Sequence, residues 1–363
     1  MRVLHVHSGN LYGGVESALA TLARSGHMAP SMEMAVALCF EGRFAAELRA
    51  AGVEPFAIGE VRLRRPDTVM RARRAFGRLL DRGGFDVVVC QQSWPLAIFG
   101  SVVREKGTPL VLWVHMAHQN HWIDRLAWRV PPDLVICNSR FTASTLPQTG
   151  APIEVVYPAV EPSPAPPRDS RSASTKVVIM QASRMEPLKG QSVCLDALGQ
   201  LRSRSNWMCW QVGGAQRPEE QRYLTSLKER ARQLGIADRV EFMGERTDVR
   251  RLCAEADIFC QPNVAPDAFG IGFIEALFAG CPVVTSGIGG ALEIVDDTCG
   301  VLVPPGDVDA LASALSTLIA NAGERGRFAA GGPRRAAALC DPATQVPRVA
   351  EVLSMVGRAL VRH

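Results

Sequence analysis

The sequence has little net charge, no C-x-x-C pair and no apolar run long enough to cross a membrane. Its 363 residues hold 40 Lys+Arg against 36 Asp+Glu, and a formal charge of +4 argues against a strongly basic nucleic-acid-binding protein. No apolar stretch approaches the roughly 20 residues of a membrane-spanning helix. A leader would begin with a charged segment followed by an apolar one. We see no such pattern before residues 3–6, which already resemble a strand. We therefore expect a cytoplasmic protein.

The ten cysteines are scattered along the chain rather than paired. Cys90 and Cys137 stand at the ends of apolar runs, where a thiol behaves as a small buried apolar side chain. A disulfide framework is typical of much shorter secreted chains. We expect the cysteines to be reduced and structural.

Short apolar stretches alternate with amphipathic ones in the first half of the chain. Strands are expected at 2–7, 34–40, 85–91, 110–115 and 133–138, each apolar throughout rather than alternating. Continuous apolar strands separated by helices indicate a parallel sheet that is covered on both faces. The pattern predicts an α/β, Rossmann-like domain over residues 1–160.

A segment rich in proline, serine and charge interrupts this pattern. It begins with the proline-rich run at Pro158, and we place a linker at 161–174, because such a composition does not build a core element. The alternation restarts at Lys176 and predicts a second Rossmann-like domain over 175–342. In open α/β sheets ligands bind beyond the carboxyl ends of the strands, so we expect a site in a cleft between the domains.

One carboxylate stands out in an apolar stretch of the second half. Residues 266–280 run from a glycine-containing turn into a helix whose only charged residue is Glu275. A buried carboxylate needs strong hydrogen bonds. Glu275 either caps its own helix or accepts hydrogen bonds from vicinal hydroxyls of a ligand, as acidic residues do with nucleotide riboses. The backbone near Gly272 and Phe273 would face an anion, and Asp267 could reach the same ligand.

Two cations stand at the first strand-to-helix turn of the second half. Arg184 can form a bidentate fork and Lys189 supplies a point charge, a combination that suits a diphosphate. The alternative is that both are solvated loop residues. Their place at the carboxyl end of a strand favours binding.

Together these motifs resemble the retaining glycosyltransferases of family 4, which have two facing Rossmann-like domains (the GT-B fold). The resemblance covers nearly the whole chain. Its motifs are, in order, Gly13-Gly14-Val15-Glu16, His115, Asn138-Ser139-Arg140-Phe141-Thr142, Arg184-x4-Lys189-Gly190, Asp267-x7-Glu275, Pro282-Val283-Val284, Gly289-Gly290-x2-Glu293 and Val303-Pro304-Pro305-Gly306-Asp307. The resemblance also implies that residues 343–363 form a helix that returns to the first domain.

The resemblance implies metal-independent, retaining transfer of a sugar from a nucleotide-diphosphate sugar to an acceptor that the sequence does not name. The implied catalytic residues are His115 beside the sugar, Arg184 and Lys189 on the diphosphate, and Asp267 on the sugar hydroxyls. The implied donor-binding residues are Gly13, Gly14, Arg246 for the base, the segment Phe269, Gly270, Ile271, Gly272 and Phe273, and Glu275 for the ribose.

The family carries Glu at its first acidic position, whereas this chain has Asp267, which leaves the sugar configuration open. Two alternatives therefore stand beside ordinary transfer: a pseudo-glycosyltransferase with a sugar-like donor, and a non-catalytic nucleotide-sugar-binding protein. We expect neither a metal nor another cofactor. The spacing His115-x2-His118-x2-His121 is not a zinc pattern, and Asp307 is better explained as a helix N-cap.

A strongly basic segment contrasts with the small total charge. Eight arginines lie between Arg62 and Arg82 against two aspartates, a local charge of +6. Apolar residues at helical spacing, from Val69 to Leu80, indicate a core-facing helix with a solvated basic face. The alternative is attraction to an acidic acceptor or to an anionic membrane, with the protein held peripherally at the inner membrane surface.

Overall fold

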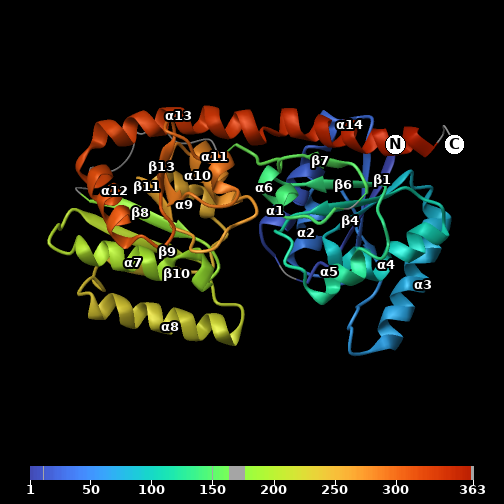
Figure 1. The fold of residues 1–363 in the computed structure, drawn as a ribbon, viewed down its shortest axis with the longest axis horizontal. Helices are drawn as coiled ribbons and strands as arrows, with labels where there is room; N and C mark the ends of the chain where they lie inside the picture. Colours follow the sequence, from blue (N-terminus) through green and yellow to red (C-terminus); the bar gives the residue numbers. More distant parts are fainter. Residues whose placement is uncertain (11, 149, 163–175, 361–363) are drawn as a thin grey trace. The chain divides into compact units, whose positions relative to one another are not determined.

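The computed structural model of the protein describes residues 1–10, 12–148, 150–162 and 176–360 (Figure 1). The chain divides into two compact units. Unit 1 comprises Met1–Glu161 with Cys340–His363, and unit 2 comprises Pro162–Leu339. All but the first two residues of the linker expected at 161–174 lie outside the described residues.

Unit 1 is built on a seven-stranded parallel sheet in the order β3-β2-β1-β4-β5-β6-β7. The strands are β1 (Arg2–His7), β2 (Glu33–Leu38), β3 (Phe56–Ala57), β4 (Val87–Gln91), β5 (Leu110–Val114), β6 (Leu134–Cys137) and β7 (Ile153–Val155). The helices are α1 (Gly14–Arg24), η1 (Gly26–Met28), α2 (Arg43–Ala50), α3 (Pro66–Gly83), α4 (Ser93–Glu105), α5 (Trp122–Ala127), α6 (Arg140–Ser144) and α14 (Pro342–Leu360).

Both faces of this sheet are buried, which explains why its strands are mostly apolar along their whole length. Along β1, Val3 belongs to the core beneath α1, α2 and α14, whereas its neighbour Leu4 belongs to the core beneath α3 and α4. Successive side chains of a strand point to opposite faces, so a sheet covered on both sides needs apolar residues at every position.

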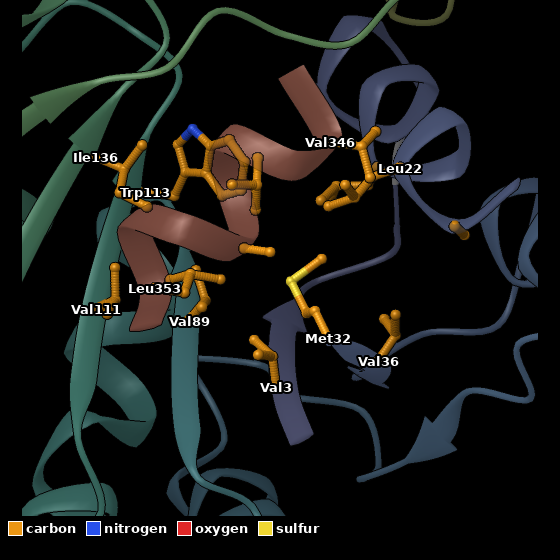
Figure 2. Packing of buried hydrophobic residues seen from close by; sticks show 14 of the residues in the cluster. Val3, Leu22, Met32, Val36, Val89, Val111, Trp113, Ile136, Val346 and Leu353 are labelled. Carbon is orange, nitrogen blue, oxygen red and sulfur yellow. The ribbon is translucent and has the colours of Figure 1, made fainter. Parts of the chain in front are cut away.

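The last helix, α14, belongs to unit 1 although the whole of unit 2 precedes it in the chain. Figure 2 shows Leu353 of α14 beside Val89 and Val111 of the sheet, and Val346 of the same helix beside Leu22 of α1. The proline-rich run also begins inside unit 1, because Val160 is buried and its N–H donates to the carbonyl of Cys340 over 2.9 Å. The first domain predicted over 1–160 thus stops one residue before Glu161, where the first stretch of unit 1 ends.

Unit 2 repeats the plan with a six-stranded parallel sheet in the order β10-β9-β8-β11-β12-β13. The strands are β8 (Val177–Ala182), β9 (Trp207–Val212), β10 (Val240–Gly244), β11 (Ile258–Gln261), β12 (Val283–Ser286) and β13 (Gly300–Val303). The helices are η3 (Pro187–Lys189), α7 (Gln191–Gln200), α8 (Pro218–Gln233), α9 (Val249–Glu255), α10 (Ile271–Phe278), α11 (Ala291–Ile294), α12 (Val308–Ala320) and α13 (Ala322–Cys340). The α/β fold class expected from the sequence is confirmed.

Several local expectations can be compared with the structure. All ten cysteines are free and buried, as expected for structural thiols. The carboxylate of Asp307 accepts a hydrogen bond from the N–H of Ala310 over 2.8 Å and so caps α12. Within the described ranges, no helix combines the length and the apolar character needed to cross a membrane.

Candidate functional site

The predicted donor-binding residues of unit 2 gather in the loops at the carboxyl edge of its sheet. The loop after β8 carries Arg184 and Lys189, and Arg246 follows β10. Asp267 lies between β11 and α10, and Glu275 lies on α10 itself. Because all six strands are parallel, these loops emerge at the same edge, which is where open α/β sheets bind ligands.

Lys189 and Asp267, which sequence reasoning selected separately, form an ion pair. The ammonium of Lys189 lies 2.5 Å from Oδ2 of Asp267, and the side chains are only 16% and 25% exposed. The other carboxylate oxygen of Asp267 accepts a hydrogen bond from the N–H of Ala268 over 3.0 Å. The pair places a cation and a hydrogen-bond acceptor side by side, and their contacts with a phosphate and a sugar hydroxyl stay predictions.

The partners of Arg184 are residues other than Lys189 and Asp267. The Arg184 side chain is 45% exposed, and its guanidinium binds Oε1 of Glu186 over 2.8 Å. The Arg184 carbonyl accepts a hydrogen bond from Nε2 of the fully buried Gln191 over 2.8 Å. Glu186 was not among the predicted site residues, and it holds the arginine fork at the surface of the loop.

Two buried glutamines and a glycine fix the loop between β8 and α7. Gln181 donates from Nε2 to the Lys189 carbonyl over 2.7 Å, and Gln191 holds the other end of the loop through Arg184. Gly190 has a φ of +72°, and a Cβ there would lie 1.8 Å from the carbonyl oxygen of Pro262. The sequence signal for both glutamines is a polar residue in an otherwise buried setting, because buried polar groups are hydrogen-bonded.

Glu275 pairs with a residue of another helix and does not cap the start of its own. Oε1 of Glu275 lies 3.5 Å from Nε of Arg250 on α9, so the structure does not show the helix-capping alternative. Burial raises the pKa of the Glu275 carboxyl, and the charge and hydrogen bond of Arg250 oppose that rise. Arg250 is a further site residue that the sequence pattern did not reveal.

In the segment from Phe269 to Phe273, the backbone rather than the side chains is available for a ligand. Phe269 and Phe273 are 2% and 0% exposed, so their rings belong to the core. Gly270, with a φ of +115°, is the N-cap of α10, and Ile271 and Gly272 form its first turn. The first N–H groups of a helix have no partner within it and attract anions.

The turn at Gly289 and Gly290 packs closely against this segment. The N–H of Gly290 donates to the Asp267 carbonyl over 2.9 Å. A Cβ at Gly289 would lie 2.5 Å from the same carbonyl oxygen, and one at Gly290 would lie 2.5 Å from the Cα of Phe269. Only glycine allows the two loops to approach so closely.

Arg246 forms an ion pair with the neighbouring Asp248. Its Nε and its Nη2 each lie 2.8 Å from a carboxylate oxygen of Asp248, and Arg251 lies 2.7 Å from the same carboxylate. The Asp248 carboxylate raises the pKa of the Arg246 guanidinium. The expected contact of Arg246 with a base stays a prediction.

His115 of unit 1 follows β5. A row of hydrogen-bonded side chains, which the sequence did not predict, holds it in place. Its Nε2 lies 2.6 Å from Oε1 of Gln91, and Nε2 of Gln91 lies 2.8 Å from Nδ1 of His5. Trp113 stacks on the His115 ring with centroids 5.4 Å apart. Because an amide oxygen only accepts, Nε2 of His115 carries the proton and Nδ1 keeps its lone pair.

Burial keeps this cluster uncharged. It lowers the pKa of His115 to about 3, with smaller contributions from His7 and His5. The pKa of His5 is lowered to about 4, also by burial. The polar residues His5 and Gln91 in otherwise apolar strands are the sequence signal for the cluster.

Gly13 and Gly14 start α1 beside the same cluster. The N–H of Gly13 donates to Oε2 of Glu16 over 2.9 Å, and Oε1 of Glu16 lies 3.3 Å from Nε2 of His7. The lone pair of His7 Nδ1 accepts from the N–H of Gly9 over 3.0 Å. The glycine turn after β1 is therefore fixed by a buried carboxylate and a histidine.

The histidines considered as metal ligands have other partners. Nδ1 of His118 lies 3.8 Å from the Asp124 carboxylate, and His121 caps α5. In the part of the chain that the structure describes, no group of three or more His, Cys, Asp or Glu side chains could hold a metal ion. Metal independence stays a prediction.

Comparison with known proteins matches each unit separately. The family model described as "Glycosyltransferase Family 4" matches residues 12–163, and that described as "Glycosyl transferases group 1" matches residues 176–321. Phosphatidyl-myo-inositol mannosyltransferase of Mycobacterium leprae is 34% identical over 188 residues, which are 50% of this chain and 48% of that protein. The match thus spans about half the length of that relative.

Two further proteins match over more of their length. The GDP-mannose-dependent alpha-(1-6)-phosphatidylinositol monomannoside mannosyltransferase of Mycolicibacterium smegmatis is 29% identical over 72% of both chains. The crystal structure of HepE of Anabaena with UDP-glucose has a TM-score of 0.84 and 25% identity over 98% of this chain and 100% of that one. The chain therefore has the GT-B fold and belongs to glycosyltransferase family 4.

Proposed function

We propose that this chain is a metal-independent, retaining glycosyltransferase that uses a nucleoside-diphosphate sugar. The observation that carries the proposal is the contact between Lys189 and Asp267, which joins a phosphate-binding cation to a sugar-binding acceptor at the carboxyl edge of unit 2. The UDP-glucose named for HepE supports a nucleoside-diphosphate sugar as the donor class.

The chemistry required of these residues is stabilisation of charge rather than covalent catalysis. Glycosyl transfer passes through an oxocarbenium-like state, and negative charge develops on the departing diphosphate. Lys189, Arg184 and the first turn of α10 supply fixed positive charge and N–H donors for it. Glu275 accepts from the ribose hydroxyls and Asp267 from the sugar hydroxyls.

Retention follows if the departing phosphate oxygen takes the proton of the acceptor hydroxyl on the face that it leaves. We assign to His115 contact with the donor sugar. Because its ring is neutral and Nε2 is bound to Gln91, only Nδ1 can accept a hydrogen bond from a sugar hydroxyl.

The acceptor that we propose is a hydroxyl of an inositol-containing compound at an anionic membrane surface. Two mycobacterial relatives are named for phosphatidylinositol compounds. The basic face of α3 supplies the positive charge that would hold the protein peripherally at the cytoplasmic surface of the membrane.

A donor panel with two variants tests the proposal. The protein is incubated with nucleoside-diphosphate sugars, and thermal shift reports binding while release of free nucleoside diphosphate reports turnover. We expect Lys189→Ala and Glu275→Ala to lose turnover and Lys228→Ala, an exposed lysine on α8, to keep it. Near-normal turnover in both site variants would contradict the assignment.

The same assay separates the alternatives that Asp267 leaves open. Binding of a nucleotide-sugar with neither hydrolysis nor transfer to any acceptor would favour a non-catalytic binding protein. Turnover only with a sugar-like donor would favour the pseudo-glycosyltransferase.

A further inference from the structure

A groove lined by arginines lies on the flank of unit 1, at the edge strand β3. Its volume is about 740 Å³, and it is formed by the end of β3, the loop that follows and one face of α3. The charged residues that line it are Arg62, Arg65, Arg71, Arg74, Arg78 and Glu60. Five arginines and one glutamate give the lining a formal charge of +4, which equals that of the whole chain.

The helical spacing explains why three of these arginines share one wall. Arg71, Arg74 and Arg78 stand at positions i, i+3 and i+7 of α3, whereas Ala72 and Phe76 are buried in the core. With a rise of 1.5 Å per residue, the outer two of these arginines are about 10 Å apart along the helix. Charges therefore follow the whole length of this wall.

The opposite wall is held in place by a buried threonine. Thr68 Oγ1 accepts from the N–H of Arg62 over 3.0 Å and donates to the carbonyl of Arg65 over 2.7 Å. Thr68 is 7% exposed and lies in the first turn of α3. One side chain thus ties the loop to the helix, so the groove has a defined wall on each side.

The charges in the groove are only partly compensated by the protein. Arg62 pairs with Glu60 over 2.9 Å, and Arg71 pairs with Asp67 over 2.7 Å. Arg74 and Arg78 have no ion-pair or hydrogen-bond partner among the residues that the structure describes. Like charges four residues apart on a helix repel each other, so an anion between these two would remove a repulsion as well as gain hydrogen bonds.

Within unit 1, the groove is separate from His115, which is assigned to transfer. β3 is the outermost strand, and four strand spacings of about 4.8 Å separate it from β5, which carries His115, or about 19 Å. Its volume lies within the range of small-molecule sites. It is therefore large enough for a ligand of its own.

We propose that this groove binds a ligand that carries two or more phosphate groups. Guanidinium groups bind phosphate bidentately, and the length of the α3 wall leaves room for more than one phosphate. A flat anionic surface would meet exposed arginines equally inside and outside the groove, whereas a protruding phosphate group can enter it. The phosphates can belong to a free molecule or to a lipid headgroup.

Two double variants of equal charge test the site in the full chain. Arg74→Ala/Arg78→Ala removes the two uncompensated arginines of the groove. Arg64→Ala/Arg82→Ala removes two exposed arginines of the same segment that do not line it. Thermal melting without ligand checks that both variants fold, and calorimetric titration with tripolyphosphate at physiological salt measures binding.

We expect the groove variant to weaken tripolyphosphate binding about tenfold or more and the control to change it by about twofold or less. Vesicles of phosphatidylcholine with phosphatidylinositol bisphosphate, or with phosphatidylglycerol at equal charge, identify the source. Preference for the bisphosphate that is lost in the groove variant indicates a lipid headgroup, and binding of tripolyphosphate alone indicates a soluble ligand. Equal weakening in the two variants, or no binding to either probe, would overturn the proposal.

Discussion

Acidification from pH 7 to pH 5 should destabilise unit 1 through its buried histidines. Burial lowers the pKa of His5 and His7 to about 4 and that of His115 to about 3. In the unfolded chain each ring takes up a proton near pH 6.5, whereas in the folded chain it stays neutral down to the lowered value. The stability is therefore fully present above pH 6.5 and is lost as the pH falls.

The size of the effect follows from proton linkage. Each histidine with this shift lowers the free energy of unfolding by about 1.4 kcal/mol per pH unit below pH 6.5, which amounts to roughly 2 kcal/mol at pH 5. His5 and His115 together then cost about 4 kcal/mol, a large part of the roughly 5–15 kcal/mol that hold a folded protein. His7, whose pKa burial also lowers to about 4, adds a similar loss.

Hydrogen exchange measured by mass spectrometry can follow this loss in unit 1 alone, through peptides that cover β1 and β5. The two units need not unfold together, so a global melting curve would mix them. His5→Gln removes one titrating ring and should recover about 2 kcal/mol of the loss at pH 5. His27→Gln, at an exposed position, should recover none.

Two outcomes would refute this reasoning. One is equal protection of β1 and β5 at pH 7 and pH 5 after correction for the intrinsic exchange rate. The other is the same pH sensitivity in the His5→Gln and His27→Gln proteins. Either would mean that these rings do not stay neutral in the folded state.

Two substitutions probe residues that hold the candidate site in place. Gly190→Ala should destabilise unit 2 by more than about 1 kcal/mol beyond Gly235→Ala, because both glycines have a positive φ, but only at Gly190 does an added Cβ meet another atom, the Pro262 carbonyl oxygen at 1.8 Å; equal shifts in the urea midpoint would contradict this. Gln91→Leu should lower kcat more than it changes the KM for the donor, because Nε2 of His115 loses its acceptor and the ring its orientation; an unchanged ¹⁵N NMR signature of the His115 tautomer together with unchanged kcat would exclude that role.

Most of the fold could be predicted because the strands are apolar throughout and the turns are polar. The helix α13 was not predicted, and its Gly331-Gly332-Pro333 sequence is unfavourable for a helix. In the structure a Cβ at Gly331 would lie 2.1 Å from the Thr298 carbonyl oxygen, and one at Gly332 would lie 2.9 Å from the Leu277 carbonyl oxygen. Close packing against the body of unit 2 therefore outweighs helix propensity there, and packing is not visible in a single sequence.

The candidate site was predicted in part for the same reason. Lys189 and Asp267 could be named from local patterns, but their ion pair depends on two loops that meet only in the folded sheet. Gln181 and Gln91 were missed because a polar residue in an apolar strand signals a buried hydrogen bond but does not identify its partner. The helical basic segment was expected, and its apolar face is confirmed in the core, but the groove depends on a loop that precedes the helix.

The place of α14 has a consequence for how the protein is made. Val346, Leu353 and other apolar residues of α14 complete a core whose remaining members belong to the first 161 residues. On the ribosome, α1 and α2 can cover their part of that face early, but the part that α14 covers stays exposed until the whole of unit 2 has been synthesised. Unit 2 is continuous in sequence and can fold as soon as it emerges, whereas domains usually fold in order from the N-terminus. The unit that is synthesised first is thus the last to be finished, and its exposed apolar face in the interval is where a chaperone would be needed most.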